Sequence, residues 1–172
     1  MSDQLEPKRT SRDLNEIQEL LAHWLKEKIS DSEAVITDLR RPSGSGMSSE
    51  TLLFNAKSEN TNSSNESSLV ARLAPTPADI PVFQKYDLDL QVRIMKIVRE
   101  KTSIPVPDVL WLETDPTVLG VPFFIMEQVN GRVPPDIPPY VFGGWLLDAS
   151  LENQKILEHQ SVEIISQLSK ID

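Results

Sequence analysis

The chain has 172 residues, of which 39% are hydrophobic, which is enough for a globular domain with a real core. Its formal net charge of -9 argues against non-specific binding to nucleic acid, which needs a basic face, and the absence of cysteine excludes disulfides, thiol chemistry and cysteine–zinc sites. No apolar run approaches the ~20 residues that span a bilayer, and the polar, charged start does not match a signal peptide. We therefore expect a cytoplasmic protein that contacts neither a membrane nor nucleic acid.

The N-terminal part predicts a flexible tail over residues 1–10 and then a helix from about Asp13 to Ile29. Asp13 and Glu16 stand where a variant of the capping box would start this helix. Its apolar residues recur at helical spacing and form one stripe. The stripe consists of Leu14, Ile17, Leu20, Leu21, Trp24 and Leu25.

Three strands are predicted next, over Ala34–Leu39, Thr51–Ala56 and Leu69–Leu73. Proline and glycine break the chain between the first two. The polar stretch Lys57–Ser68 separates the second from the third, and because it holds no core residues it predicts a mobile hairpin tip.

A second helix is predicted from about Phe83 to Glu100, where Pro105 and Pro107 follow its end. Its inward face is expected to consist of Phe83, Tyr86, Leu90, Ile94, Ile97 and Val98.

The remaining chain predicts strands over Val109–Leu112 and Pro122–Val129, a stiff proline-rich linker over Val133–Pro139, and a final helix over Leu151–Leu168. The order is therefore helix, three strands, helix, two strands, linker, helix. Short connections between sequential strands favour an α+β fold, with an antiparallel five-stranded sheet and helices on one side.

The loop from Arg41 to Ser49 is rich in glycine and serine, which leave backbone N–H groups exposed and suit phosphate oxygens. Its candidate ligand-binding residues are Ser43, Gly44, Gly46, Ser48 and Ser49. The pattern lacks the Gly-Lys-Ser/Thr of a phosphate-binding P-loop and no helix follows it. An ordinary flexible hairpin is the alternative.

Arg72 is a single charge within an apolar strand, so it is either a solvated outward side chain or a cation directed at phosphates. Asp87 and Asp89 invite a metal-site interpretation, but positions two apart on a helix point in different directions. A charged first turn that suits the helix dipole is the better interpretation.

From about Val35 to Asp172, the chain resembles the aminoglycoside phosphotransferase-like family, whose members have a protein-kinase-like fold. The resemblance runs through five segments, Gly46–Phe54, Leu69–Leu73, Gln91–Met95, Ile104–Pro107 and, most specifically, Gly120–Arg132.

The resemblance implies a nucleotide site. The loop from Gly46 through Met47 and Ser48 to Ser49 would cover the phosphates of ATP or GTP, and Arg72 would lie near them. Backbone groups of Glu127, Gln128 and Val129 would bond the adenine edge.

The resemblance also implies a domain organisation: a nucleotide-binding N-lobe over residues 11–129, a hinge and linker over 130–139, and the start of a truncated helical C-lobe over 140–172. The family's catalytic aspartate and its Mg²⁺-binding aspartate lie beyond this chain, so we expect neither a catalytic residue nor a metal ligand here. Gln91 replaces the glutamate that usually partners the basic residue, and it can hydrogen-bond Arg72 without forming an ion pair.

The expected function is the ATP-binding lobe of a phosphotransferase that moves the γ-phosphoryl to a hydroxyl of an unidentified small molecule. The chain alone is expected to be inactive. A non-catalytic nucleotide-binding or protein-interaction module is the alternative, and an α+β module with no ligand is a third. Truncation would expose Ile156, Ile164, Ile165 and Leu168 and allow self-association.

Overall fold

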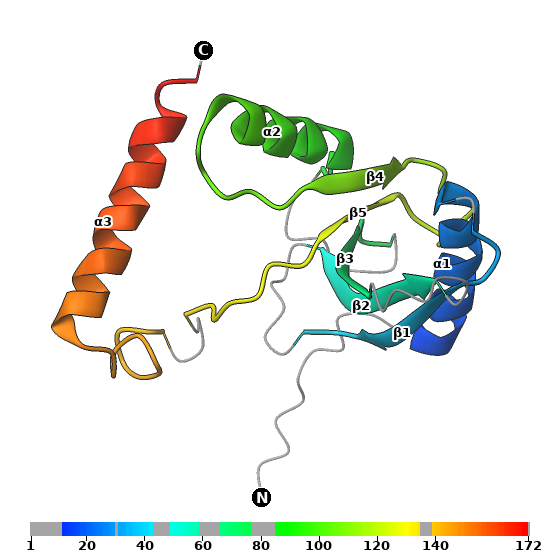
Figure 1. Ribbon diagram of the computed structural model, residues 1–172, viewed down its shortest axis with the longest axis horizontal. Helices are drawn as coiled ribbons and strands as arrows, with labels where there is room; N and C mark the ends of the chain where they lie inside the picture. The colour runs from blue at the N-terminus through cyan, green and yellow to red at the C-terminus, as the bar shows by residue number, and fades with distance from the viewer. Residues whose placement is uncertain are drawn as a thin grey trace, which may run out of the picture. The chain divides into compact units, whose positions relative to one another are not determined.

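The computed structural model describes residues 12–29, 31–42, 49–58, 66–76, 85–134 and 139–171 (Figure 1). In chain order the elements are α1 (Leu14–Ile29), β1 (Ala34–Arg40), β2 (Glu50–Ser58), β3 (Ser67–Leu73), α2 (Leu88–Lys101), β4 (Val109–Glu113), β5 (Phe123–Glu127) and α3 (Leu151–Leu168). Each of the eight predicted elements is present. The largest difference is at the start of α2, which begins at Leu88 rather than at Phe83.

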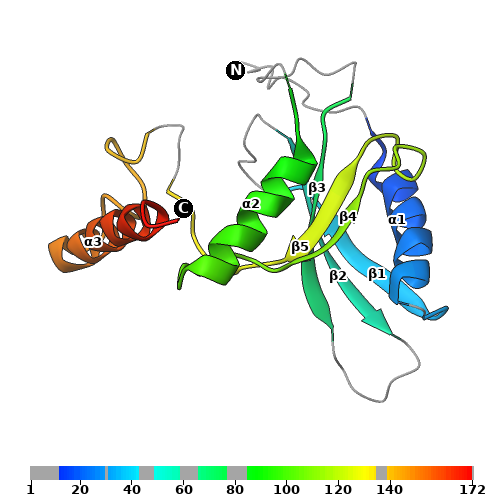
Figure 2. The same ribbon diagram turned by 90° about the horizontal axis from the view of Figure 1, so that it is seen from above.

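The five strands form one antiparallel sheet in the order β1-β2-β3-β5-β4, which confirms the predicted α+β fold (Figures 1 and 2). The last strand in the sequence, β5, lies between β3 and β4 and is therefore an interior strand. The edge strand β1 is interrupted between Thr37 and Arg40 by a shift in register, where Asp38 has a φ of 54°. Such a bulge twists a strand and suits an edge position.

Contacts divide the chain into two compact units. The first comprises Met1–Val92 and Val109–Gln128, and it holds α1, the whole sheet and the start of α2. The second comprises Arg93–Asp108 and Val129–Asp172, and it holds the rest of α2 and all of α3.

Helix α1 supplies one side of the core of the first unit. The Asp13 side chain accepts a hydrogen bond from the Asn15 N–H at 2.8 Å and so caps the first turn. Ile17, Leu21, Trp24 and Leu25 are buried at helical spacing, whereas Leu20, which we had placed in the same stripe, is 43% exposed. The predicted stripe is therefore correct in phase but too wide.

Trp24 fixes α1 to strands β4 and β5. Its ring meets Phe123 and Trp111 edge-on, with centroids 4.9 Å and 6.1 Å away. Its indole N–H donates to Glu113 Oε2 at 2.8 Å, and Lys28 Nζ lies 3.1 Å from the same oxygen. One carboxylate at the end of β4 thus holds two residues of α1.

The predicted inward face of α2 is wrong. Leu90, Ile94 and Ile97 are 44%, 50% and 43% exposed, and the buried side chains of the helix are Leu88 and Val92. The helix begins at a cap formed by Asp87, whose Oδ1 accepts from the Leu90 N–H at 2.8 Å. This cap gives the Asp87 carboxylate a structural role. Phe83 lies outside the described residues.

Helix α3 begins at Ser150, whose hydroxyl accepts from the Asn153 N–H, and no described residue of this helix is buried. The Gln154 amide donates to the carbonyls of Leu146, Leu147 and Ala149 and so holds the chain before the helix. Four apolar residues of α3 are exposed, as the sequence predicts. Their exposed fractions are 48% for Ile156, 38% for Ile164, 66% for Ile165 and 41% for Leu168. No helix in the described part of the chain combines the length and apolarity needed to cross a bilayer.

Candidate functional site

Arg72 occupies a half-buried position on β3 between the buried residues Ala71 and Leu73. Its Nη2 and Nε groups both donate to the Ser49 hydroxyl, at 2.6 Å and 3.2 Å. Ser49 immediately precedes β2, the neighbouring strand, and Thr51 of β2 lies opposite Arg72. The strand pairing therefore brings together two of the predicted site residues, Ser49 and Arg72.

Burial removes water from the Arg72 guanidinium, and this desolvation lowers the pKa of Arg72 from its ordinary value. Arginine nevertheless stays protonated at physiological pH. Among the residues that the structure describes, no carboxylate forms an ion pair with Arg72; its contacts there are to a neutral hydroxyl. Within the described residues, the Arg72 guanidinium is therefore half-buried and hydrogen-bonded to a neutral group.

Apolar side chains share the face of the sheet to which Arg72 points. Alternation along a strand places Val70 on the same face as Arg72, and the register adds Phe124 and Met126 from β5. Val70 and Phe124 are buried and Met126 is half-buried. The protein itself therefore covers Phe124 and Val70, whereas Arg72 and Met126 keep part of their surface exposed.

The backbone at the end of β5 is partly committed to the sheet. The Gln128 N–H donates to the Ser68 carbonyl at 3.0 Å, so it is not available as a donor to a ligand. In an antiparallel pair, hydrogen-bonded and non-bonded residue pairs alternate, so the backbone groups of Glu127, which is opposite Leu69, are directed away from β3. The structure thus commits the N–H of Gln128, one of the three predicted hinge residues, to the sheet.

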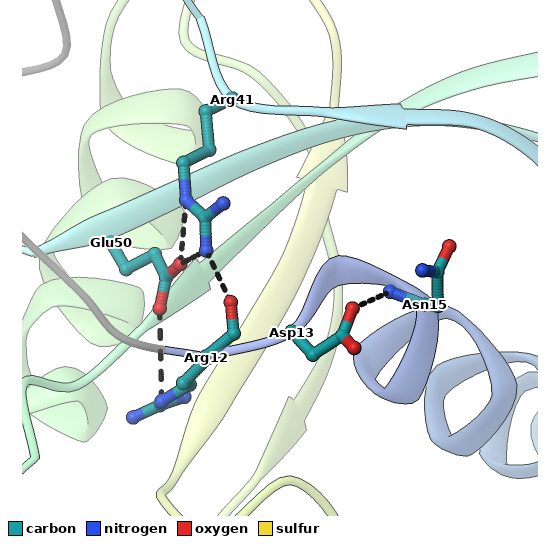
Figure 3. A network of polar contacts seen from close by, with 5 residues as sticks. All are labelled: Arg12, Asp13, Asn15, Arg41 and Glu50. Atoms are coloured by element: carbon teal, nitrogen blue, oxygen red, sulfur yellow. Dashed lines mark hydrogen bonds and ion pairs between the residues drawn. The ribbon is translucent and has the colours of Figure 1, made fainter.

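A second cluster lies at the start of β2 (Figure 3). Glu50 Oε1 accepts from Arg41 Nη2 at 2.8 Å and from Arg41 Nε at 3.1 Å, while Glu50 Oε2 lies 3.8 Å from Arg12 Nε. Arg41 Nη2 also donates to the Arg12 carbonyl at 3.1 Å. The Glu50 and Arg12 side chains are only 10% and 15% exposed. The sequence carries no signal for this cluster, because its members come from three separate segments.

The other predicted site residues divide into two groups. Ser43, Gly44, Gly46, Met47 and Ser48 lie outside the described residues. Gln91 is described and is half-buried on α2, whereas the hydrogen bonds that Arg72 makes to described residues go to Ser49. No group of three or more His, Asp or Glu side chains able to hold a metal ion is present in the described ranges.

A shallow groove of about 270 Å³ lies between α1 and β1. Gln18 crosses it and donates its side-chain amide to the Ile36 carbonyl at 3.2 Å. The groove shares no residue with the Arg72 and Glu50 clusters.

No family model matches the chain. Among curated proteins, the chain is similar to "Probable acyl-CoA dehydrogenase IBR3" of Arabidopsis thaliana, with 41% identity over 46 residues, which are 27% of this chain and 6% of that protein. Among solved structures, it is similar to a "putative aminoglycoside phosphotransferase" from Ralstonia eutropha JMP134, with a TM-score of 0.45 and 23% identity over 67% of this chain and 28% of that chain. The chain thus spans less than a third of either protein.

Proposed function

We propose that this chain is the ATP-binding lobe of a small-molecule phosphotransferase, which transfers the γ-phosphoryl of ATP or GTP to a substrate hydroxyl. The observation that carries the proposal is the half-buried Arg72 guanidinium, which two hydrogen bonds hold on Ser49 and which has no ion-pair partner among the described carboxylates. A guanidinium in this state binds phosphate strongly, because its donors are charged and poorly solvated.

The position of Arg72 along β3 fits a nucleotide that lies along the strand. Arg72 is three residues from Leu69, the partner of Glu127, and three steps along an antiparallel strand span about 10 Å. This separation would place the phosphates at Arg72 and Ser49, and the base near Met126, which keeps part of its surface exposed. The Glu127 carbonyl and the Val129 N–H would then bond the adenine edge.

The chain's own contribution to phosphoryl transfer is to bind and orient the nucleotide. The described residues include no carboxylate cluster that fits Mg²⁺, so we assign no step through a metal to this chain. The base that activates the acceptor hydroxyl would also come from outside it. The isolated chain is therefore expected to bind nucleotide without turnover.

Nucleotide titrations followed by NMR test this proposal. Removing a hydrogen bond to a charged group costs about 1.5–3 kcal/mol, so Arg72→Ala is expected to weaken ATP binding at least about tenfold. Adenosine binding should not change, because Arg72 acts on phosphate. The matched control is Lys96→Ala, which removes an exposed cation from α2. Equal weakening of ATP and adenosine, or no ATP-induced shift at Ser49 or Arg72 at millimolar concentration, would refute the proposal.

The hinge contact needs its own variants. Val129→Pro removes the N–H proposed to bond the base, so it should weaken ATP and adenosine by the same factor. Val129→Ala keeps the N–H and removes most of a side chain that is 67% exposed, so it should change neither affinity. If both variants behave alike, the backbone does not bond the base.

A further inference from the structure

We infer that Glu50 is a positioning residue for Arg72: it anchors the start of β2 from one face of the sheet, so that Ser49 holds the Arg72 guanidinium from the other. This inference deepens the nucleotide site and rests on the proposed function for its effect on ATP. Its effect on Arg72 itself can be measured without any ligand.

Ser49 and Glu50 are adjacent residues whose side chains lie on opposite faces of the sheet. Successive side chains of a strand point to opposite faces. Ser49 turns its hydroxyl to Arg72, while Glu50, which pairs with Leu73, turns its carboxylate to Arg41 and Arg12 (Figure 3). A displacement of the Glu50 backbone would carry Ser49 with it.

The contacts of the Glu50 carboxylate with Arg41 and Arg12 hold the start of β2 firmly. Both oxygens of Glu50 are used, because Oε1 accepts two N–H groups of Arg41 and Oε2 faces Arg12 Nε. With Glu50 10% and Arg12 15% exposed, water and salt screen these charges less than at an open surface. The two hydrogen bonds from Arg41 also fix the orientation of its guanidinium relative to the Glu50 carboxylate, which a single hydrogen bond would not.

The Glu50 carboxylate joins three segments of the chain. Arg41 follows β1, Glu50 begins β2, and Arg12 precedes α1. The bond from Arg41 Nη2 to the Arg12 carbonyl adds a contact that does not involve Glu50. Three segments therefore converge on one carboxylate next to the residue that holds Arg72.

The positioning role and simple electrostatics predict opposite changes in ATP affinity when Glu50 is replaced. Glu50→Gln removes a negative charge near the proposed phosphates, so charge alone would strengthen ATP binding. Positioning predicts the reverse, because the amide cannot compensate two guanidinium groups and the start of β2 would lose its anchor. We expect ATP to bind about fivefold more weakly and adenosine to bind unchanged.

The experiment has two readouts on the full chain. The first is the exchange rate of the Arg72 Nε proton with water in the absence of nucleotide, measured by ¹⁵N NMR; Glu50→Gln should raise it several-fold. The second is the ratio of ATP to adenosine affinity. Glu66→Gln is the control, because Glu66 is an exposed carboxylate that accepts from the Thr37 hydroxyl, and its loss changes the net charge equally.

If Glu50→Gln leaves the exchange rate of the Arg72 Nε proton unchanged, the inference is overturned, whatever the change in ATP affinity. ATP binding that is equally tight or tighter in Glu50→Gln overturns it as well. If the wild type binds no ATP, the proposed function fails, and the exchange rate alone then decides the role of Glu50. If Glu50→Gln does not fold, Arg41→Lys decides instead, since it keeps the charge and loses the two-point contact. It should shift both readouts in the same direction by a smaller factor.

Discussion

Replacing Glu113 with glutamine should remove a pH-dependent part of the stability of the first unit. The pKa of Glu113 is lowered from 4.5 to about 2, mainly because the Trp24 indole N–H donates to its carboxylate, and further because of the Asp115 N–H and the Lys28 ammonium. Burial acts in the opposite direction and does not overcome these contacts. The ionised carboxylate is therefore stabilised in the folded state.

The size and sign of this stabilisation follow from the linkage between protonation of Glu113 and unfolding. A folded pKa of about 2 against an ordinary value of 4.5 corresponds to about 3 kcal/mol of unfolding free energy. Because the folded pKa is the lower one, this stabilisation is complete above about pH 5 and is lost as the pH falls to about 2. Glu113→Gln keeps the shape of the side chain and an acceptor for Trp24 but removes the charge. It should be less stable than the wild type at neutral pH by up to this amount, and equal to it near pH 2.

Urea unfolding at a series of pH values measures the difference. Trp24 and Trp111 lie in the first unit and Trp145 in the second, so both proteins should carry Trp145→Phe to restrict the fluorescence signal to the first unit. Glu19→Gln, which removes an exposed carboxylate from α1, is the control for the loss of one negative charge. Its curve should follow that of the wild type.

The decisive quantity is the gap in unfolding free energy between the wild type and Glu113→Gln as a function of pH. A gap that stays constant between about pH 5 and pH 2 would mean that Glu113 has the same proton affinity in both states. The contacts of Glu113 with α1 would then not stabilise its ionised carboxylate in the folded state.

Two further predictions concern the two units separately. Phe54→Ala should destabilise the first unit by about 3–5 kcal/mol, because Phe54 is fully buried on β2 and its truncation leaves a cavity; a loss below about 1 kcal/mol in urea unfolding would place Phe54 outside the core. Ser150→Ala should cost about 1 kcal/mol of local stability at the start of α3 and speed hydrogen exchange at the Asn153 N–H, whereas Ser150→Asp should restore the cap; exchange that is equal in all three proteins would contradict the cap.

The secondary structure could be predicted because its signals are local. The limits of α3 agree with the prediction to the residue, and those of α1 agree within one residue, since apolar periodicity marks both helices and Asp13 marks the start of α1. The buried face of α2 could not be predicted in this way. Apolar residues on this helix form two stripes, one through Leu88 and Val92 and one through Leu90 and Ile94, and periodicity alone does not say which stripe meets the core.

The candidate site was predicted only in part, for a similar reason. Arg72 was visible as a charge within an apolar strand, and its contact with Ser49 follows from the pairing of β2 with β3. The contact of Glu113 with Trp24 was missed because the two residues are 89 positions apart. Arg41 is only nine positions from Glu50, but their contact forms across an intervening segment that has no periodic pattern. Such contacts exist only after the strands have been ordered, and the sequence does not show that order.

The interior position of β5 in the sheet has a consequence for how the chain folds. Strands β1, β2 and β3 are neighbours in sequence, whereas Leu73 and Phe123, which pair across β3 and β5, are separated by roughly fifty positions and need the closure of a long loop. Until β5 arrives, the inner edge of β3 lacks its hydrogen-bonding partner, and Phe123, Phe124 and Ile125 remain outside the core that later buries them completely. If the first three strands pair before β5 is made, β3, like β1, is an edge of that array, and its open edge could pair with a second nascent chain.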